Sequence, residues 1–407
     1  MKKLNVFLII VCLFGACASQ NLNSQSTSEK SISTLQNNQD ETSKKITTKN
    51  SNKDIIQKKP SGTVYKTIDD AYLAMTKKLA DLPEESVKSA FELAVDILKN
   101  NPAHVRANIV LFEAHLYRGN EDQVVEQFKK LLTLKPETPE LCIELGTVIA
   151  KLGKISEAMI MFHRSIELNP KFAKGYYNLG RAFFMKRNFE QAVIAYQKTV
   201  ELDPTEYRAW NNLGWVYMAQ KKYEQSETYL KKAIETKNDY PVAHLNLGLV
   251  YIVQQKFDDA EKMLKKYIEF KPDDSEGYRN LSSVYQQKGK MDDAIQTLRT
   301  FLKRKPDDII AKNNLAVLLL SKARYGESVK LLKSVKDKNV NDPKFKKEVL
   351  KTLAVASYHL AEALAKTDDK QRQAINAYQD YLNFSENLSE NVIKSVKAKI
   401  KKIENSM

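Results

Sequence analysis

The chain has 407 residues and is basic, with 65 Lys and Arg against 50 Asp and Glu and a formal net charge of +15. It contains only 12 Gly and 11 Pro, about 3% each, where average proteins use about 7% and 5%. Sheet-rich folds spend these residues on many tight turns, so their shortage favours helices joined by short loops. The three cysteines exclude a disulfide framework.

Residues 1–16 have the form of an export signal. Two lysines precede an apolar run over residues 4–14, and about 11 residues are too few to span roughly 30 Å of hydrocarbon. Residues 13–17, Leu-Phe-Gly-Ala-Cys, resemble a bacterial lipobox, with Phe14 in the place usually held by Leu. The resemblance implies a lipid on Cys17, and Ala18 after the cysteine implies sorting to an outer membrane.

Two other fates of this leader remain open. Ala16 and Ala18 give the small-x-small form of ordinary signal cleavage after Ala18, which would release the protein. An uncleaved leader would instead stay as an N-terminal anchor.

Residues 17–64 follow as a polar segment. Ser, Thr, Asn and Gln occupy 24 of the 42 positions from 19 to 60. Such a segment buries too little apolar surface to offset its ordering entropy, so we expect a disordered tether.

From residue 65 onward the sequence is periodic, and the positions of several residue types recur at one fixed step. Six prolines and one asparagine form one such series: Pro102, Pro136, Pro170, Pro204, Asn238, Pro272 and Pro306. A leucine series runs in the same register: Leu145, Leu179, Leu213, Leu247, Leu281 and Leu315. Each leucine precedes a small residue, namely Gly146, Gly180, Gly214, Gly248, Ser282 and Ala316. A period of about 34 residues indicates a stack of helix pairs.

These residues resemble tetratricopeptide (TPR) repeats, most fully at Trp210, Leu213, Gly214 and Tyr217. The match covers seven repeats over 105–342, with divergent units at 71–104 and 344–386. The resemblance implies an all-α fold, a right-handed α-α superhelix of antiparallel helix pairs over residues 65–386. Residues 387–407 are predicted to form a capping helix, because Val392, Val396, Ile400 and Ile403 share one face.

Helical spacing supports the same architecture independently. Two apolar stripes occur in each unit, and a short break such as 186–188 lets the second helix fold back on the first. Proline in the periodic series ends each second helix. One pair cannot bury both faces, so stability must come from stacking.

In TPR arrays the first helices line a concave groove, and the resemblance therefore implies a partner-binding face. An asparagine series lies there: Asn178, Asn212, Asn246, Asn280 and Asn314. A similar asparagine ladder in O-linked N-acetylglucosamine transferase implies binding of an extended peptide, although Asn at this place is also a common mark of the repeat. Around it we predict positive charge from Lys174, Arg181, Arg208 and Arg279, and flat apolar surface from Tyr177, Phe184 and Trp215. Val242, Leu245, Leu249, Ile252 and Val253 make the next unit more apolar. The chain's own tail is an alternative occupant.

Catalytic and metal chemistry find no support in the sequence. The five histidines have no metal-ligand spacing, and no phosphate-binding loop or nucleophile motif is present. Cys142 and His244 fall at the place of Trp210 in their repeats, which predicts packed side chains. We therefore expect no enzyme activity, no cofactor and no metal.

The excess of basic over acidic residues is concentrated in one segment. Residues 322–351 carry 10 Lys and Arg against 4 Asp and Glu. This segment is interpreted as a solvated helix face or as a contact with an anionic membrane or acidic protein, and no nucleic-acid partner is expected.

Together these observations predict a lipid-anchored, non-catalytic scaffold or adaptor in the cell envelope, facing the periplasm, that binds protein or peptide partners through its concave groove. The alternatives are a periplasmic or secreted ligand- or glycan-binding protein, and a cytoplasmic TPR adaptor whose leader is misread.

Overall fold

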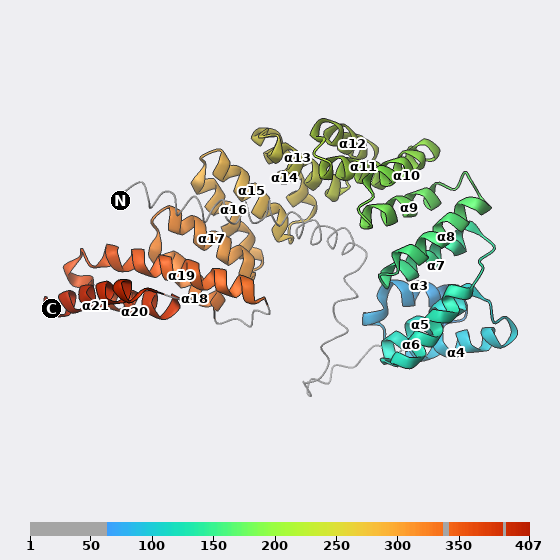
Figure 1. The fold of residues 1–407 in the computed structure, drawn as a ribbon, viewed down its shortest axis with the longest axis horizontal. Coiled ribbons are helices and arrows are strands. Elements are labelled where there is room, and N and C mark those ends of the chain that lie inside the picture. Colours follow the sequence, from blue (N-terminus) through green and yellow to red (C-terminus); the bar gives the residue numbers. More distant parts are fainter. Residues whose placement is uncertain (1–62, 337–341, 386–387) are drawn as a thin grey trace. The chain divides into compact units, whose positions relative to one another are not determined.

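The computed structural model describes residues 63–336, 342–385 and 388–407, and these residues contain helices and no strands (Figure 1). The all-α prediction is confirmed. The helices in the first half are α3 (Ile68–Lys78), α4 (Glu84–Asn100), α5 (Val105–Arg118), α6 (Glu121–Thr133), α7 (Pro139–Lys151), α8 (Ile155–Leu168), α9 (Ala173–Met185), α10 (Phe189–Leu202) and α11 (Tyr207–Ala219). Those that follow are α12 (Tyr223–Thr236), α13 (Pro241–Val253), α14 (Phe257–Phe270), α15 (Ser275–Gln287), α16 (Met291–Arg304), α17 (Ile309–Ser321), α18 (Tyr325–Lys336), α19 (Pro343–Leu364), α20 (Gln371–Phe384) and α21 (Glu390–Glu404). Two short 3₁₀ turns, Leu79–Asp81 and Asp368–Lys370, complete the described elements.

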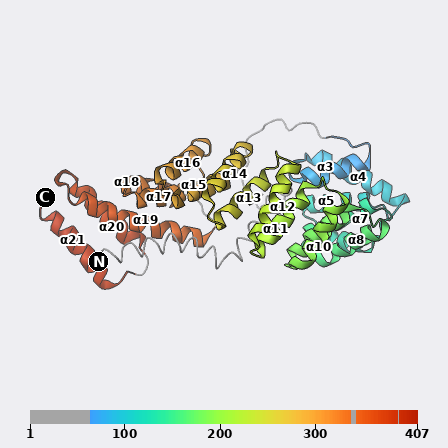
Figure 2. The same ribbon diagram turned by 90° about the horizontal axis from the view of Figure 1, so that it is seen from above.

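The helices form antiparallel pairs that stack on their neighbours, as expected for an α-α solenoid (Figure 2). They divide into two compact units, an N-terminal unit that ends at Val216 and a C-terminal unit, Tyr217–Met407, so α11 contains the boundary. In each unit the core lies within and between pairs. Leu145, Phe162 and Leu179 belong to one buried cluster, and Leu247 and Leu264 belong to another.

The periodic series of prolines marks a repeated hydrogen bond as well as a helix end. For five of the seven series members, the side chain six positions later donates to the carbonyl oxygen of that member. The observed pairs are Asn108 Nδ2 to Pro102 O (3.0 Å), Cys142 Sγ to Pro136 O (3.8 Å), Trp210 Nε1 to Pro204 O (2.9 Å), His244 Nε2 to Asn238 O (2.7 Å) and Tyr278 OH to Pro272 O (3.2 Å). Cys142 and His244 are buried, with exposed fractions of 0% and 3%, which confirms the prediction that both are packed.

The turn inside each helix pair is equally regular. One residue in every turn from α5–α6 to α17–α18 has a left-handed backbone, with φ between 58° and 76°: Gly119, Gly153, Arg187, Lys221, Gln255, Gly289 and Ala323. The next backbone N–H then bonds the carbonyl five positions back, as from Lys256 N to Tyr251 O at 2.8 Å. This is the hydrogen bond that ends helices in Schellman motifs, and it reverses the chain within a short turn.

Small residues on the first helix let the second helix approach. A Cβ added at Gly180 would lie 2.8 Å from Cδ1 of Tyr196, and one added at Gly146 would lie 2.6 Å from Cε1 of Phe162. Both contacts are closer than side chains tolerate, so the two helices of a pair pack at a distance that only Gly permits here.

The C-terminal end departs from the repeat. Helix α19, the first helix of the divergent unit, is 22 residues long, and α21 packs on α20. Val396 and Ile403 of α21 are buried. Lys399 Nζ lies 2.6 Å from Glu362 Oε1 and donates to Tyr358 OH at 2.9 Å, which ties α21 to α19.

The predicted signal (1–16), the lipidation residue Cys17 and most of the tether lie outside the described residues. The tether's last two residues, 63 and 64, are described, and Thr63 N donates to Ser86 Oγ on α4 at 2.8 Å. Just after the tether, Tyr65 N donates to Ser89 Oγ on α4 at 3.0 Å. None of the described helices has the length and apolar character needed to cross a membrane.

Candidate functional site

The candidate site is the face formed by the first helices of successive pairs, which we call the first-helix face. In the N-terminal unit α3 contacts α5, α5 contacts α7, and α7 contacts α9. In the C-terminal unit α13, α15, α17 and α19 follow one another in the same way. Side chains one repeat apart on the helices within each of these runs are therefore neighbours, and in the C-terminal unit this applies to Asn246, Asn280 and Asn314.

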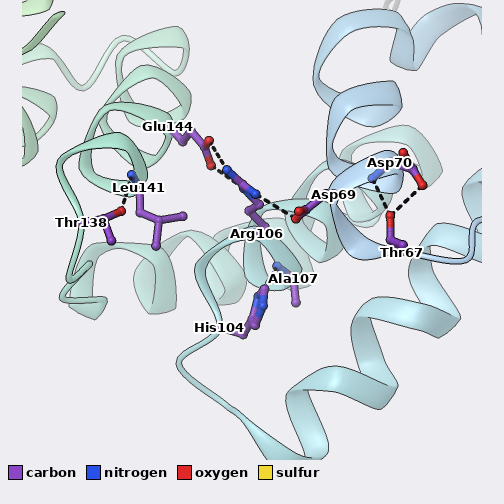
Figure 3. Close-up of polar contacts among 9 residues, drawn as sticks. All are labelled: Thr67, Asp69, Asp70, His104, Arg106, Ala107, Thr138, Leu141 and Glu144. Carbon is purple, nitrogen blue, oxygen red and sulfur yellow. Dashed lines mark hydrogen bonds and ion pairs between the residues drawn. The ribbon is translucent and has the colours of Figure 1, made fainter.

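At the start of the N-terminal unit an ion-pair cluster occupies this face (Figure 3). The Arg106 guanidinium on α5 donates to Glu144 on α7 at 2.9 and 2.7 Å and to Asp69 on α3 at 2.9 Å. It also lies 5.5 Å from the Tyr72 ring centroid. Hydrogen bonds from Arg106 to Glu144 and Asp69 outweigh partial burial and raise the pKa of Arg106. The Arg106 side chain thus links three successive first helices, α3, α5 and α7.

Sequence reasoning missed this cluster, although a signal was present. Glu144 stands one repeat before Asn178, so it occupies the asparagine place in its own repeat. An acidic residue at that place indicates a basic partner on a neighbouring first helix.

Further along the N-terminal unit, Arg208 of α11 is held in a defined position. Its Nε and Nη2 donate to the two carboxylate oxygens of Glu206, both at 2.7 Å. The guanidinium lies 5.5 Å from the Tyr177 ring centroid and 5.7 Å from that of Tyr207. Hydrogen bonding to Glu206 outweighs burial and raises the pKa of Arg208. This predicted groove cation is therefore already paired.

Lys174 and Arg181 on α9 are different. Lys174 is exposed and Arg181 is half-buried, and neither forms an ion pair within the described part of the chain. Half-buried aromatic side chains lie on α9 and on the next first helix, α11. They are Tyr177 and Phe184 on α9 and Trp215 on α11. Burial raises the pKa of the Tyr177 hydroxyl, while Arg181 and Arg208 lower it.

The asparagine side chains of the series differ in their exposure and in whether their amide groups already form hydrogen bonds. Asn178 is buried and its Nδ2 donates to the Lys174 carbonyl at 2.9 Å, and Asn246 is also buried. Asn212 is half-buried and its Nδ2 donates to Tyr196 OH at 3.3 Å. Asn178 therefore has a structural role inside its own helix, which agrees with the reading of the series as a mark of the repeat. Peptide binding by the series stays a prediction.

In the C-terminal unit the first-helix face carries both polar and apolar side chains. The Nδ2 atom of Asn280 is buried without a hydrogen-bond partner among the described residues, Asn314 is half-buried, and Arg279 lies 3.8 Å from Glu276. On α13, Leu245 is buried, Val242, Leu249 and Ile252 are half-buried, and Val253 is 46% exposed. The predicted apolar stretch is thus partly accessible.

Models of the tetratricopeptide repeat match residues 217–283 in one case and residues 143–207, 177–241 and 279–343 in another. Residues 143–343 of this chain are therefore tetratricopeptide repeats. No curated protein matches the chain.

Several solved structures share the fold. A MamA protein is 23% identical over 41% of this chain and 92% of its own, with a TM-score of 0.38. A chain of the APC/C hetero-tetramer Cut9–Hcn1 is 18% identical over 66% of this chain and 52% of its own, with a TM-score of 0.44. The Pseudomonas aeruginosa pilF protein is 18% identical over 51% of this chain and 95% of its own, also with a TM-score of 0.44. The chain is similar to these proteins in fold alone.

Proposed function

We propose that this protein is a lipid-anchored TPR scaffold that binds protein or peptide segments of the cell envelope, and that the α9–α11 part of its first-helix face is the main contact. The observation that carries the proposal is the contrast between cations. Arg106 has two carboxylate partners and Arg208 has one, whereas Lys174 and Arg181 have none within the described residues.

This contrast matters energetically. A cation saturated by internal carboxylates gains little from a partner, whereas an unpaired cation beside aromatic surface gains a new charge-assisted bond. Aromatic side chains and arginine are also the usual centre of an interface. A segment with acidic and apolar residues would match this surface of α9 and α11.

Capture of a partner tests this part of the proposal. The double variant Lys174→Glu, Arg181→Glu should recover about tenfold less cross-linked partner from intact envelopes than the unchanged chain, because reversed charges repel an acidic segment. The matched control is Lys129→Glu, Lys262→Glu, which makes the same charge change at exposed places on the second helices α6 and α14. Equal capture of the partner by the α9 double variant and by the control would contradict a contact on α9.

The lipid anchor has its own test. Cys17→Ser should release the protein from the membrane fraction, because thioether attachment of a lipid needs that sulfur. Cys12→Ser, a cysteine in the same leader, is the control and should leave membrane association unchanged. Sedimentation of both variants with membranes would contradict the anchor without touching the scaffold assignment. With Cys17 lipidated, an outer-membrane, periplasm-facing position is our preferred location.

A further inference from the structure

Helix α21 has two chemically distinct faces. Val396 and Ile403 are buried and Lys399 is bonded to Glu362, so this side is fixed against the preceding helices. The opposite side carries four exposed lysines: Lys394, Lys397, Lys401 and Lys402. We call these four residues the lysine face.

Two exposed carboxylates, Glu390 and Glu404, lie on the same side of α21, so the four lysines leave a net excess of two positive charges there. Lys394 lies 3.9 Å from Glu390, a loose pair in which the two side chains are 77% and 90% exposed. An exposed pair such as Lys394–Glu390 neutralises little in water. The face therefore keeps an excess of positive charge, with Lys397, Lys401 and Lys402 in no ion pair within the described residues.

The residues between the lysines are small. Asn391, Ser395 and Ala398 are exposed and lie on the same side of the helix as the lysines. A protein partner would need an aromatic or aliphatic anchor to reach useful affinity, and this side of α21 provides none. A bilayer with anionic headgroups needs no such anchor, because it attracts a basic helix through its surface potential.

We propose that the lysine face of α21 binds an anionic phospholipid surface. Each lysine held near such a surface contributes on the order of 1 kcal/mol, which is about a fivefold change in binding. Four lysines alone give weak, reversible binding, and a second attachment to the same membrane would make it stable. The face would bind lipid whether or not the first-helix face binds a protein.

Vesicle partitioning tests the proposal. The full chain with Cys17→Ser, which has no site for the lipid, is mixed with vesicles of phosphatidylcholine alone or with about 30–40% phosphatidylglycerol, a fraction that suffices for a strong surface potential. We expect binding to the anionic vesicles that is lost when salt is raised from about 0.05 M to about 0.5 M. In the same background, Lys397→Gln, Lys401→Gln, Lys402→Gln should lower the partition coefficient about 100-fold.

The control variant is Lys129→Gln, Lys171→Gln, Lys262→Gln, which removes the same charge from three exposed places outside both α21 and the basic segment 322–351. The control should lose far less binding to anionic vesicles than the α21 triple variant. The leader is identical in all variants, so any binding that it contributes is the same in each. Circular dichroism of each variant verifies that the helices remain. Equal loss in both triple variants, or no preference of the parent chain for anionic vesicles, would overturn the proposal.

Discussion

Acidification from pH 5 to pH 2 is expected to remove several kcal/mol from the stability of the C-terminal unit, and two carboxylates should account for much of the loss. Glu227 on α12 and Glu261 on α14 stand one repeat apart and have equivalent surroundings. Lys231 and Lys256 bind Glu227 at 2.8 and 2.9 Å, and Lys265 and Lys288 bind Glu261 at 2.7 and 2.6 Å. A tyrosine hydroxyl also donates to each carboxylate, from Tyr251 at 3.3 Å and from Tyr285 at 3.0 Å.

The direction of the pH effect follows from these contacts. Burial alone would raise the pKa of each glutamate, but the hydrogen bonds from the lysines outweigh it and lower both pKa values from 4.5 to about 2. A lowered pKa in the folded state means that the stabilisation is complete above the unfolded-state pKa and disappears as pH falls from about 4.5 through about 2. A shift of that size corresponds to at most about 3 kcal/mol for each carboxylate.

Urea unfolding between pH 7 and pH 2.5 measures the effect. The double variant Glu227→Gln, Glu261→Gln should be clearly less stable than the parent chain at pH 7, and the difference should shrink as pH falls below 4.5. Glu201→Gln is the control, because that carboxylate is in a side chain 66% exposed and, among the residues the structure describes, pairs only with Lys198. A difference that is constant with pH would show that the two glutamates act through packing rather than charge.

Gly180→Ala is expected to lower the free energy of unfolding of the N-terminal unit by about 1–3 kcal/mol. The added Cβ would lie 2.8 Å from the ring of Tyr196, and that ring belongs to a side chain only 2% exposed, so it has little room to move. Alanine is the better helix former by up to about 1 kcal/mol, so a loss of stability would mean that the steric contact outweighs helix propensity. Thermal and urea unfolding both report the change.

Gly326→Ala provides the matched control. Nothing lies within 4 Å of a Cβ added there, so helix propensity acts alone and stability should stay constant or rise slightly. A Gly180→Ala variant that is as stable as the parent would mean that α9 and α10 can separate, and it would contradict the close packing described for this pair.

The repeat made much of the fold predictable from sequence. Periodic residues act locally: Pro204 ends α10, Gly180 allows close packing, and alternating apolar stripes define two helices per unit. The same period correctly predicted that Cys142 and His244 are packed, because each occupies the place of Trp210. A property that depends on position within one repeat is visible in the sequence.

The state of the candidate site was much less predictable. Arg208 was expected to offer positive charge, yet the nearby Glu206 binds its guanidinium in the structure. Arg106 was not recognised at all, because its partners Asp69 and Glu144 are distant in the sequence and lie on different helices. Side-chain pairing depends on rotamers and on contacts between repeats, and neither has a period that a single sequence displays.

The hydrogen bond that returns from a side chain to the carbonyl six positions before it, present at five of the seven series members, has a consequence for how such repeats diverge. Amide, thiol, indole, imidazole and phenol groups all serve as the donor here. The position therefore requires a side chain that is long enough to reach the carbonyl and that carries a polar hydrogen to donate. Several amino acids meet both requirements. Replacement is tolerated, whereas an insertion or deletion between carbonyl and donor would break the bond for every side chain. Constant spacing with variable identity is the expected outcome, and repeat length is then a more durable mark of ancestry than residue identity.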